Sequence, residues 1–170
     1  MVKAIKAMLI PNNVQKTKMF QYAGASRFAY NWALAREKEN YEKGGKFISD
    51  SELRKEFTKL RHSDEYAWLL NISNNVTKQA IKDACTAYKN FFKGLQKFPR
   101  FKSRKRSMPK FYQDNVKIQF SNTHVKLEGF SSSRKGKTSV TANDSWQALS
   151  ISANSSSSVG ARCGQKAFPI

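Results

Sequence analysis

Positive charge and aromatic rings alternate along a stretch of the chain between Phe91 and Tyr112, FFKGLQKFPRFKSRKRSMPKFY. We call this stretch the basic tract; it contains no acidic residue. Like charges in a row attract a polyanion, and flat rings offer surfaces on which nucleic-acid bases stack. We therefore predict that the basic tract binds nucleic acid. Its positive residues are Lys93, Lys97, Arg100, Lys102, Arg104, Lys105, Arg106 and Lys110.

The alternative is a solvated loop that only keeps the protein in solution, but solubilising surfaces usually mix both charge signs. Within the tract, Pro99 favours an extended backbone at Phe98 and so predicts a corner at 98–101. The rings of Phe98 and Phe101 either face a ligand or anchor this corner in the core. Arg100 and the run 104–106 are therefore the strongest candidates for direct contact.

The composition supports the same class of partner. The 170 residues include 31 Lys and Arg against 12 Asp and Glu, giving a formal net charge of +19. This size allows one domain, or one domain with a tail. No apolar run approaches the roughly 18 residues that span a membrane, and the start lacks the apolar segment of a signal peptide. We expect a cytoplasmic protein, nucleoid-associated if it binds DNA, with no membrane partner and an undetermined oligomeric state.

The sequence shows no group of residues arranged for catalysis. The chain has no glycine-rich phosphate loop, and His62 and His124 stand apart from any cysteine or carboxylate cluster. Metal-dependent cleavage of phosphodiesters needs several convergent carboxylates, whereas the acids here alternate with Lys and Arg on helical faces. Cys85 falls on an apolar helical stripe and is expected to be a buried thiol. We predict no enzymatic activity, no metal, no cofactor and no small-molecule substrate.

The first half of the chain reads as a strand followed by helices. An apolar stretch, 2–10, ends at a Pro-Asn-Asn turn and predicts a strand. The pattern then predicts a helix from 13 to a stop at Gly24, and a second helix from 26 to Gly44 and Gly45. The sequence Ser-Asp-Ser-Glu at 49–52 is a capping-box pattern that opens a third helix. Its inward face is expected to hold Leu53, Phe57 and Leu60.

The remaining pattern predicts a long helix, a hairpin and a tail. Residues 66–70 form an apolar group, expected as a short helix in the core. A helix is predicted over 73–95, with a buried stripe that includes Ile81, Cys85, Tyr88, Phe92 and Leu95. Its lysines, Lys78, Lys82, Lys89 and Lys93, lie off this stripe and are free to face phosphates. Apolar residues then alternate over 116–120 and 125–128, which predicts a hairpin able to pair with the first strand. From 131 the chain becomes Ser-rich, and we expect a disordered tail.

Four segments together resemble one protein family. They are SRFAYNWAL at 26–34, AWL at 67–69, AYKNFF at 87–92 and FPRFK at 98–102. Their order and spacing are similar to the start of TnpB proteins, transposon-encoded proteins also described as OrfB-type transposases with a helix-turn-helix N-terminus. The likeness covers about residues 2–135. It implies an RNA-guided DNA endonuclease related to type V CRISPR effectors, in which base pairing reads the target and protein reads a short flanking motif.

The resemblance also implies an architecture. The expected fold class is α+β, with a helical recognition-type bundle inserted between the strands of a small wedge-type β domain. The wedge-like segments are 1–12 and 113–130, the helical recognition-like, helix-turn-helix part is 13–96, the basic aromatic linker is 97–112 and the tail is 131–170. The resemblance places contacts to the flanking motif near Asp50, Arg54, Asn74 and Lys78, with Tyr112 and Gln113. Asp50 is better explained as a capping residue, because a carboxylate beside DNA is unfavourable.

The combined expectation is a chain that binds guide RNA and double-stranded target DNA. The residues expected at the interface are Arg54, Asn74, Lys78, Lys82, Lys93, Lys97, Arg100, Lys102, Arg104, Lys105, Arg106, Lys110, Tyr112 and Gln113. TnpB proteins continue into a RuvC-like nuclease domain with metal-binding acids and a zinc finger, neither of which is found in this sequence. We therefore expect a truncated relative without the nuclease, whose tail arose by a frameshift. The alternatives are a stand-alone basic regulator that binds DNA or RNA, and a non-functional product of a decayed transposon.

Overall fold

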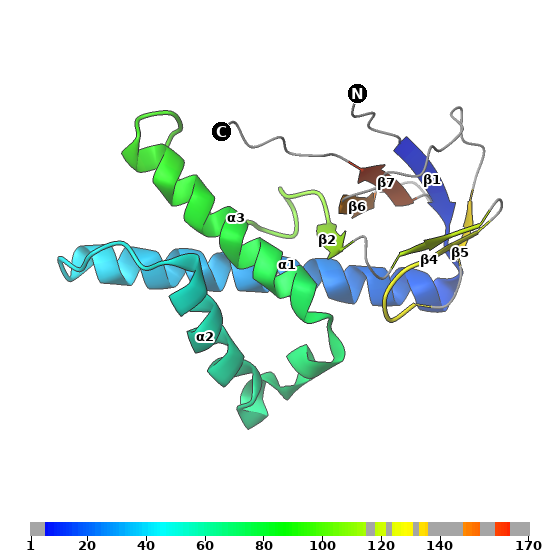
Figure 1. The fold of residues 1–170 in the computed structure, drawn as a ribbon, viewed down its shortest axis with the longest axis horizontal. Helices are drawn as coiled ribbons and strands as arrows, with labels where there is room; N and C mark the ends of the chain where they lie inside the picture. The colour runs from blue at the N-terminus through cyan, green and yellow to red at the C-terminus, as the bar shows by residue number, and fades with distance from the viewer. Residues whose placement is uncertain are drawn as a thin grey trace. The chain divides into compact units, whose positions relative to one another are not determined.

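The computed structural model describes residues 6–114, 118–121, 124–130, 133–135, 148–153 and 159–163. Most of these residues are helical, with one short strand before the helices and the others after them, which fits the expected α+β class (Figure 1). The chain divides into two compact units, Met1–Ala23 with Met108–Ile170, called the sheet unit, and Gly24–Ser107, called the helical unit. The elements are β1 Lys6–Ile10, α1 Asn13–Glu42, α2 Asp50–Arg61, the 3₁₀ helix η1 Asp64–Asn71, α3 Asn74–Phe92, β2 Lys110–Asp114, β3 Gln119–Phe120, β4 His124–Lys126, β5 Ser133–Lys135, β6 Ala148–Ala153 and β7 Val159–Cys163.

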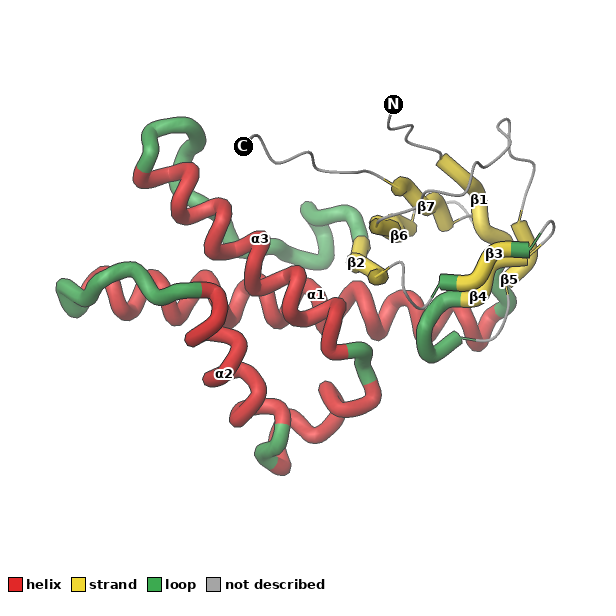
Figure 2. The backbone as a smooth tube through the Cα atoms, viewed as in Figure 1, coloured by secondary structure: helices red, strands yellow, loops and turns green. Residues whose placement is uncertain are grey.

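The first helix passes through Gly24 without a break, so the predicted stop there is wrong (Figure 2). Gly24 keeps a negative φ, unlike Gly44, where φ is 73°. A glycine inside a helix costs only about 1 kcal/mol. Burial of Tyr22 and Ala25, on either side of Gly24, outweighs that cost. The predicted end of the helix at Gly44 is confirmed, because α1 ends at Glu42.

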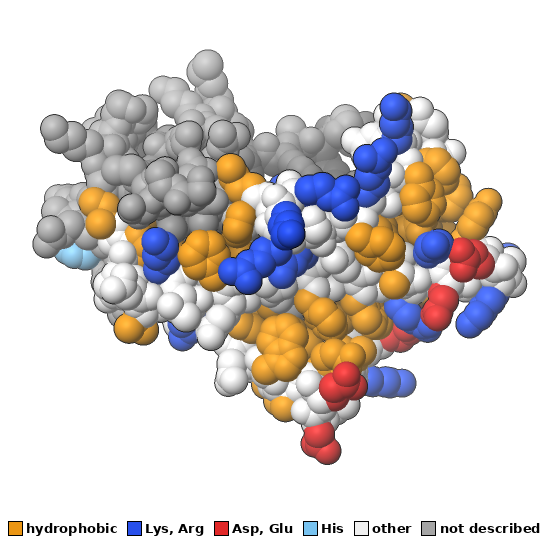
Figure 3. Space-filling model, turned by 180° about the vertical axis from the view of Figure 1, so that it is seen from behind, with side chains coloured by type: hydrophobic (Ala, Val, Ile, Leu, Met, Phe, Trp, Pro, Cys, Tyr) orange, Lys and Arg blue, Asp and Glu red, His pale blue; other side chains and the backbone are white. Residues whose placement is uncertain are grey.

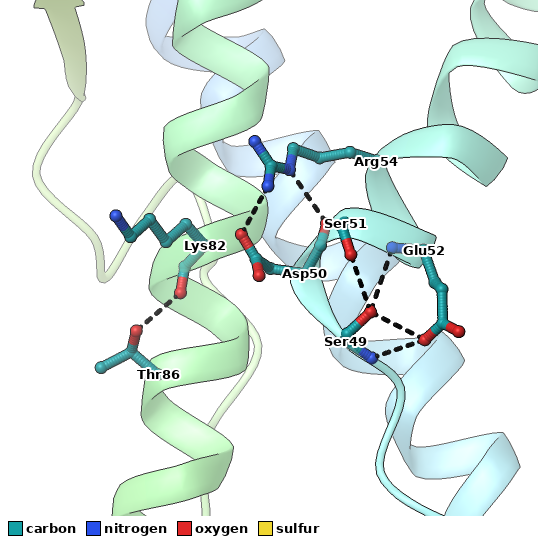
Figure 4. A network of polar contacts seen from close by, with 7 residues as sticks. All are labelled: Ser49, Asp50, Ser51, Glu52, Arg54, Lys82 and Thr86. Carbon is teal, nitrogen blue, oxygen red and sulfur yellow. Dashed lines mark hydrogen bonds and ion pairs between the residues drawn. The ribbon is translucent and has the colours of Figure 1, made fainter.

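The predicted capping box of α2 is present. The amide of Glu52 donates to the Ser49 hydroxyl over 3.3 Å, and the amide of Ser49 donates to the Glu52 carboxylate over 3.0 Å (Figure 4). Leu53 and Phe57 are buried, as predicted. The ring of Phe57 packs against α1, with its centroid 5.1 Å from that of Trp32. These contacts fix α2 against α1 inside the helical unit.

The buried stripe predicted for α3 is confirmed for its first part only. Ile81, Cys85 and Tyr88 are buried, but Phe92 is 50% exposed and Leu95 is 70% exposed. The helix ends at Phe92, and Gly94 with φ of 71° turns the chain, so Leu95 does not continue the stripe. The Tyr88 hydroxyl donates to the carbonyl of Leu34 on α1, which joins these two helices.

The apolar group at 66–70 is a short helix, but it is not wholly buried. Leu69 is fully buried, whereas Trp68 is 46% exposed and Leu70 is 50% exposed. A 3₁₀ helix has three residues per turn, so three consecutive side chains point in three directions and one neighbour cannot cover them all. The expectation that the whole group packs into the core is therefore wrong.

The sheet unit contains seven described strands in the order β2-β6-β7-β1-β5-β4-β3. The predicted hairpin is formed by β3 and β4, with Phe120 opposite Val125. Its pairing with the first strand is indirect, because β5 lies between β4 and β1. Residues 115–117, 122 and 123 of the predicted hairpin lie outside the described residues.

The Ser-rich tail, for which disorder over 131–170 is predicted, contributes three of these strands: β5, β6 and β7. The segment β6 pairs with β2 and β7, and β7 pairs with β1. Its sequence, ALSISA, alternates apolar and small polar residues, a period of two that the Ser-rich composition conceals. The remaining tail residues lie outside the described part of the chain, and a frameshifted tail stays a prediction.

The described core of the sheet unit forms where α1 begins. The ring centroid of Tyr22 lies 5.4 Å from that of Phe111 in β2 and 4.8 Å from that of Phe130. Gly129 has φ of 76°, and a Cβ there would lie 2.6 Å from the Tyr22 hydroxyl. Only glycine fits this turn, since both its backbone angle and its space exclude a side chain.

Candidate nucleic-acid interface

The basic tract leaves α3 as a loop from Lys93 to Ser107, which we call the basic loop. Six of its cations are exposed and make no ion pair with any described residue. The amide of Ser107 donates to the carbonyl of Ser103 over 2.9 Å, closing one turn. This turn carries a run of three cations, so their charges are concentrated in one place. The six cations are Lys93, Lys97, Arg100, Arg104, Lys105 and Arg106.

The side chain of Asn31 holds the basic loop against α1. Its amide nitrogen donates to the Lys102 carbonyl over 2.9 Å, and its oxygen accepts from the Lys102 amide over 2.8 Å. The Lys102 ammonium lies 3.4 Å from the ring centroid of Tyr30. Lys102 is therefore engaged within the helical unit, and its role as a phosphate contact stays a prediction.

Sequence reasoning missed the role of Asn31 and Tyr30. Both lie in the segment 26–34 that carries the family resemblance, and that resemblance was the sequence feature that could have pointed to them. No local pattern could have paired them with Lys102, because Asn31 and Lys102 are 71 residues apart.

The corner at 98–101 is partly anchored. The ring of Phe98 packs edge-on against Tyr88 and Phe91, at centroid distances of 5.6 and 5.2 Å. Pro99 is buried, whereas Phe98 is 45% exposed and Phe101 is 53% exposed. Ring contacts thus hold Phe98 in place, but both rings remain about half exposed, and contact of either ring with a ligand stays a prediction.

The predicted residues of α2 and α3 lie on neighbouring helices. Arg54 pairs with Asp50, with 2.8 Å between the guanidinium and the carboxylate, whereas the Lys82 side chain extends from α3 away from this pair (Figure 4). Asn74 and Lys78 are exposed in the first turns of α3. Ser49, rather than Asp50, caps α2, so the expected capping role of Asp50 is replaced by an ion pair.

The last predicted residues, Lys110, Tyr112 and Gln113, lie in β2 of the sheet unit. The strand β2 therefore begins within the last residues of the expected linker 97–112. Gln113 is fully buried, and its amide donates to Glu128 over 3.1 Å. It cannot reach a nucleic acid in this structure, because alternate residues of a strand face opposite sides and Gln113 faces the core. Lys110 is exposed.

The electrostatic setting favours a polyanion. Between Asp83 and Asp114 the sequence has no acidic residue. Figure 3 shows a row of Lys and Arg side chains beside hydrophobic ones, with the acidic side chains elsewhere on that face. One further cation, Arg61, is buried and donates to the carbonyls of Leu69 and Ile72. Burial lowers the pKa of Arg61, which belongs to the core of the helical unit.

The described residues offer neither a metal site nor a membrane-spanning helix. They contain no cluster of three His, Cys, Asp or Glu placed to hold a metal ion. None of their helices combines the length and the apolar character needed to cross a bilayer.

Comparison with known proteins gives a family and two relatives. The family model described as a helix-turn-helix domain, of the OrfB type of IS605 elements, matches residues 1–46. Within this range the described residues form β1 and the single helix α1. The chain is 36% identical over 126 residues to the "Putative RNA-guided DNA endonuclease InsQ" of Escherichia coli (strain K12), covering 74% of this chain and 31% of the relative.

A second relative, the "Putative RNA-guided DNA endonuclease" of Streptomyces pristinaespiralis, is 30% identical over 105 residues. This match covers 62% of the chain and 26% of the relative. The chain thus spans less than a third of the length of either relative. The family resemblance predicted from the sequence motifs is confirmed over the matched residues of this chain. Over about three quarters of its length, the chain belongs to the TnpB (OrfB-type) transposase family, with a helix-turn-helix family domain at its N-terminus.

Proposed function

We propose that this chain binds nucleic acid through the basic loop of its helical unit. The observation that carries the proposal is the set of six exposed cations between Lys93 and Arg106, none of them paired with a described acid. Unpaired surface cations that displace counterions from phosphates supply most of the affinity in such complexes. Because Asn31 and Tyr30 hold Lys102, the loop keeps part of its shape before binding, which reduces the entropy lost on association.

We further propose that the ligands are a guide RNA and its target DNA. The names of the two relatives support this, and so does the family match. In this proposal the helical unit acts as a recognition-type domain and the sheet unit as a wedge-type domain. Arg54, Asn74, Lys78 and Lys82 then contact the short duplex motif beside the target.

A salt titration of binding tests the role of the basic loop. The loop variant changes Arg100, Arg104, Lys105 and Arg106 to Gln. A control variant changes four exposed lysines of the same unit, Lys43, Lys46, Lys55 and Lys59, to Gln and so has the same net charge. Fluorescence anisotropy then measures affinity for a labelled hairpin RNA and for a labelled DNA duplex at several salt concentrations. The duplex has about 20 base pairs, the usual length of a guide–target heteroduplex.

The loop variant is expected to lose affinity, and its slope of log K against log salt should fall by about 3, since each phosphate contact contributes about 0.7–0.9. The control variant should keep most of the slope. Equal slopes for the two variants would overturn the assignment of binding to this loop. Sequencing of nucleic acid that co-purifies with the wild-type chain tests the ligand: one dominant structured RNA supports a guide RNA, and a mixed population contradicts it.

A further inference from the structure

A small cavity lies within the helical unit where α1 ends. Its polar lining comes from Glu37 and Asn40, and its apolar lining includes the rings of Tyr41, Phe47, Tyr88 and Phe92. The cavity has a volume of about 20 Å³. That is room for one water-sized group, since such a group needs roughly 10–15 Å³ by this measure. The proposed binding function does not use this cavity.

Glu37 gives the cavity its chemistry. Its side chain is only 3% exposed, and its Oε2 accepts from the amide of Ile48 over 3.4 Å. The other oxygen, Oε1, has no hydrogen-bond partner among the described residues. A buried acceptor without a donor is costly to leave unsatisfied. The cavity therefore suits a ligand that brings one small hydrogen-bond donor.

The rings at the cavity provide a stacking surface. Tyr41 is 62% exposed and Phe92 is 50% exposed, with 5.7 Å between their centroids. The Lys89 ammonium lies 5.2 Å from the ring centroid of Phe47, and Lys93 is exposed where the basic loop begins. Exposed rings beside cations match the requirements of an unpaired base and its phosphate.

From this arrangement we infer that the cavity reads an unpaired nucleobase that carries an exocyclic amino group. The inference rests on the proposed binding of nucleic acid. The base ring is too large for the cavity and stacks outside it on Tyr41 and Phe92. Its amino nitrogen is the size of a water molecule, enters the cavity and donates to Oε1 of Glu37. Cytosine and adenine satisfy this arrangement, whereas uracil and hypoxanthine present a carbonyl oxygen at the same position and are repelled.

Charge argues against a free cationic amine as the ligand. The chain has a formal net charge of +19, and Lys89 and Lys93 lie close to the cavity in the sequence and the fold. A cation is repelled by this surface. The amino group of a base is neutral and is linked to a phosphate that the same surface attracts.

Matched oligonucleotides test the inference. Seven-nucleotide RNAs of cytidine and of uridine differ in the amino or carbonyl group at position 4 and in the proton on the adjacent N3. Adenosine and inosine oligomers form the same comparison for purines, at position 6 and N1. We expect the wild-type chain to bind each amino base roughly 10- to 150-fold more tightly than its carbonyl counterpart, as for one hydrogen bond to a charged group. Equal affinities within both pairs would overturn the inference.

The Glu37→Gln variant sharpens the test. The Ile48 amide keeps the carbonyl oxygen of the new side chain, so its NH₂ group faces the cavity and replaces an acceptor with a donor. The preference should then be lost or reversed toward uridine, and an unchanged preference for cytidine would contradict the inference. The loop variant separates this result from the proposed function. If it loses affinity for both oligomers while the wild type binds both equally, the function stands and the inference fails.

A second pair of variants covers the case in which Glu37→Gln does not fold. Removing the exposed ring in Tyr41→Ala should weaken binding of both oligomers at least fivefold, as for the loss of one stacked base. Phe20, which is 43% exposed on α1 in the sheet unit, supplies the control Phe20→Ala. Equal effects of the two substitutions would place the stacking surface elsewhere.

Discussion

Asn31 is predicted to keep the basic loop closed. Its side chain donates to and accepts from the backbone of Lys102, at 2.9 and 2.8 Å. Asn31→Ala removes both hydrogen bonds. Asn31→Asp retains the acceptor for the Lys102 amide but loses the donor to the Lys102 carbonyl. The two substitutions therefore remove two hydrogen bonds and one hydrogen bond, respectively, at the same position.

The magnitude follows from the two hydrogen bonds. Each contributes about 0.5–1.5 kcal/mol net, so Asn31→Ala should cost about 1–3 kcal/mol of closure free energy. Since 1.4 kcal/mol corresponds to a factor of about ten, the population of open loop should rise roughly 5- to 150-fold. Asn31→Asp should fall between the wild type and Asn31→Ala.

Limited trypsin digestion measures the open population directly, because the loop is rich in Lys and Arg. At low trypsin concentration the cleavage rate follows the open population rather than the rate of opening. Cleavage after Arg100, Lys102 and Arg104 should accelerate in Asn31→Ala by the factor above. Asn90→Ala is the control, because the Asn90 side chain has no hydrogen-bond partner among the described residues and it precedes the loop on α3.

The reasoning would be refuted by equal cleavage rates in the wild type, Asn31→Ala and Asn90→Ala. Acceleration at every site in the chain would also contradict it, because that pattern indicates global unfolding rather than a local opening. A loop released from Asn31 should also bind nucleic acid more weakly with an unchanged salt slope, since the charges remain and only their arrangement is lost.

Three further predictions concern stability. Gly24→Ala should stabilise the protein by about 0.5–1 kcal/mol in urea denaturation, because Gly24 is helical and a Cβ there meets nothing within 4 Å; destabilisation would mean that α1 bends at this position. Ser49→Ala should cost about 1 kcal/mol through loss of the cap on α2, and an unchanged denaturation midpoint would contradict the capping role. Burial raises the pKa of Glu37 above its ordinary value of 4.5, against the opposing effects of the Ile48 amide and Lys89. The folded state therefore binds this proton more tightly than the unfolded state, and the wild type loses stability as pH rises from 4.5 through the raised pKa. Glu37→Gln should raise the melting temperature at neutral pH and lose this advantage below about pH 4, where both states of the wild type are protonated; a pH-independent difference would exclude titration of Glu37 as its cause.

Local spacing was sufficient for several parts of the structure. The pattern at Ser49 and Glu52 predicted the capping box, and three- and four-residue steps predicted the burial of Phe57, Cys85 and Tyr88. These features depend on residues within about one or two helical turns, so their geometry follows from the period of the helix. The charge of the basic tract also needs no fold to be recognised.

Other features required the tertiary structure. Gly24 is a helix stop by local preference, yet α1 continues through it because its neighbours are buried. The strands of the tail gain their partners from β1 and β2, which precede them by many residues. A weak period of two becomes a strand only when another strand satisfies its backbone hydrogen bonds.

By itself, the sequence determined the charge, the helical periods and the family, and these predicted which part of the chain meets nucleic acid. The tertiary structure decided which of those residues are available. It joined the backbone of Lys102 to Asn31, buried Gln113 and left one oxygen of Glu37 without a hydrogen-bond partner among the described residues. The physical reason is distance along the chain. Charge and period are properties of neighbouring residues, whereas burial and hydrogen-bond partners are set by side chains that only packing brings together.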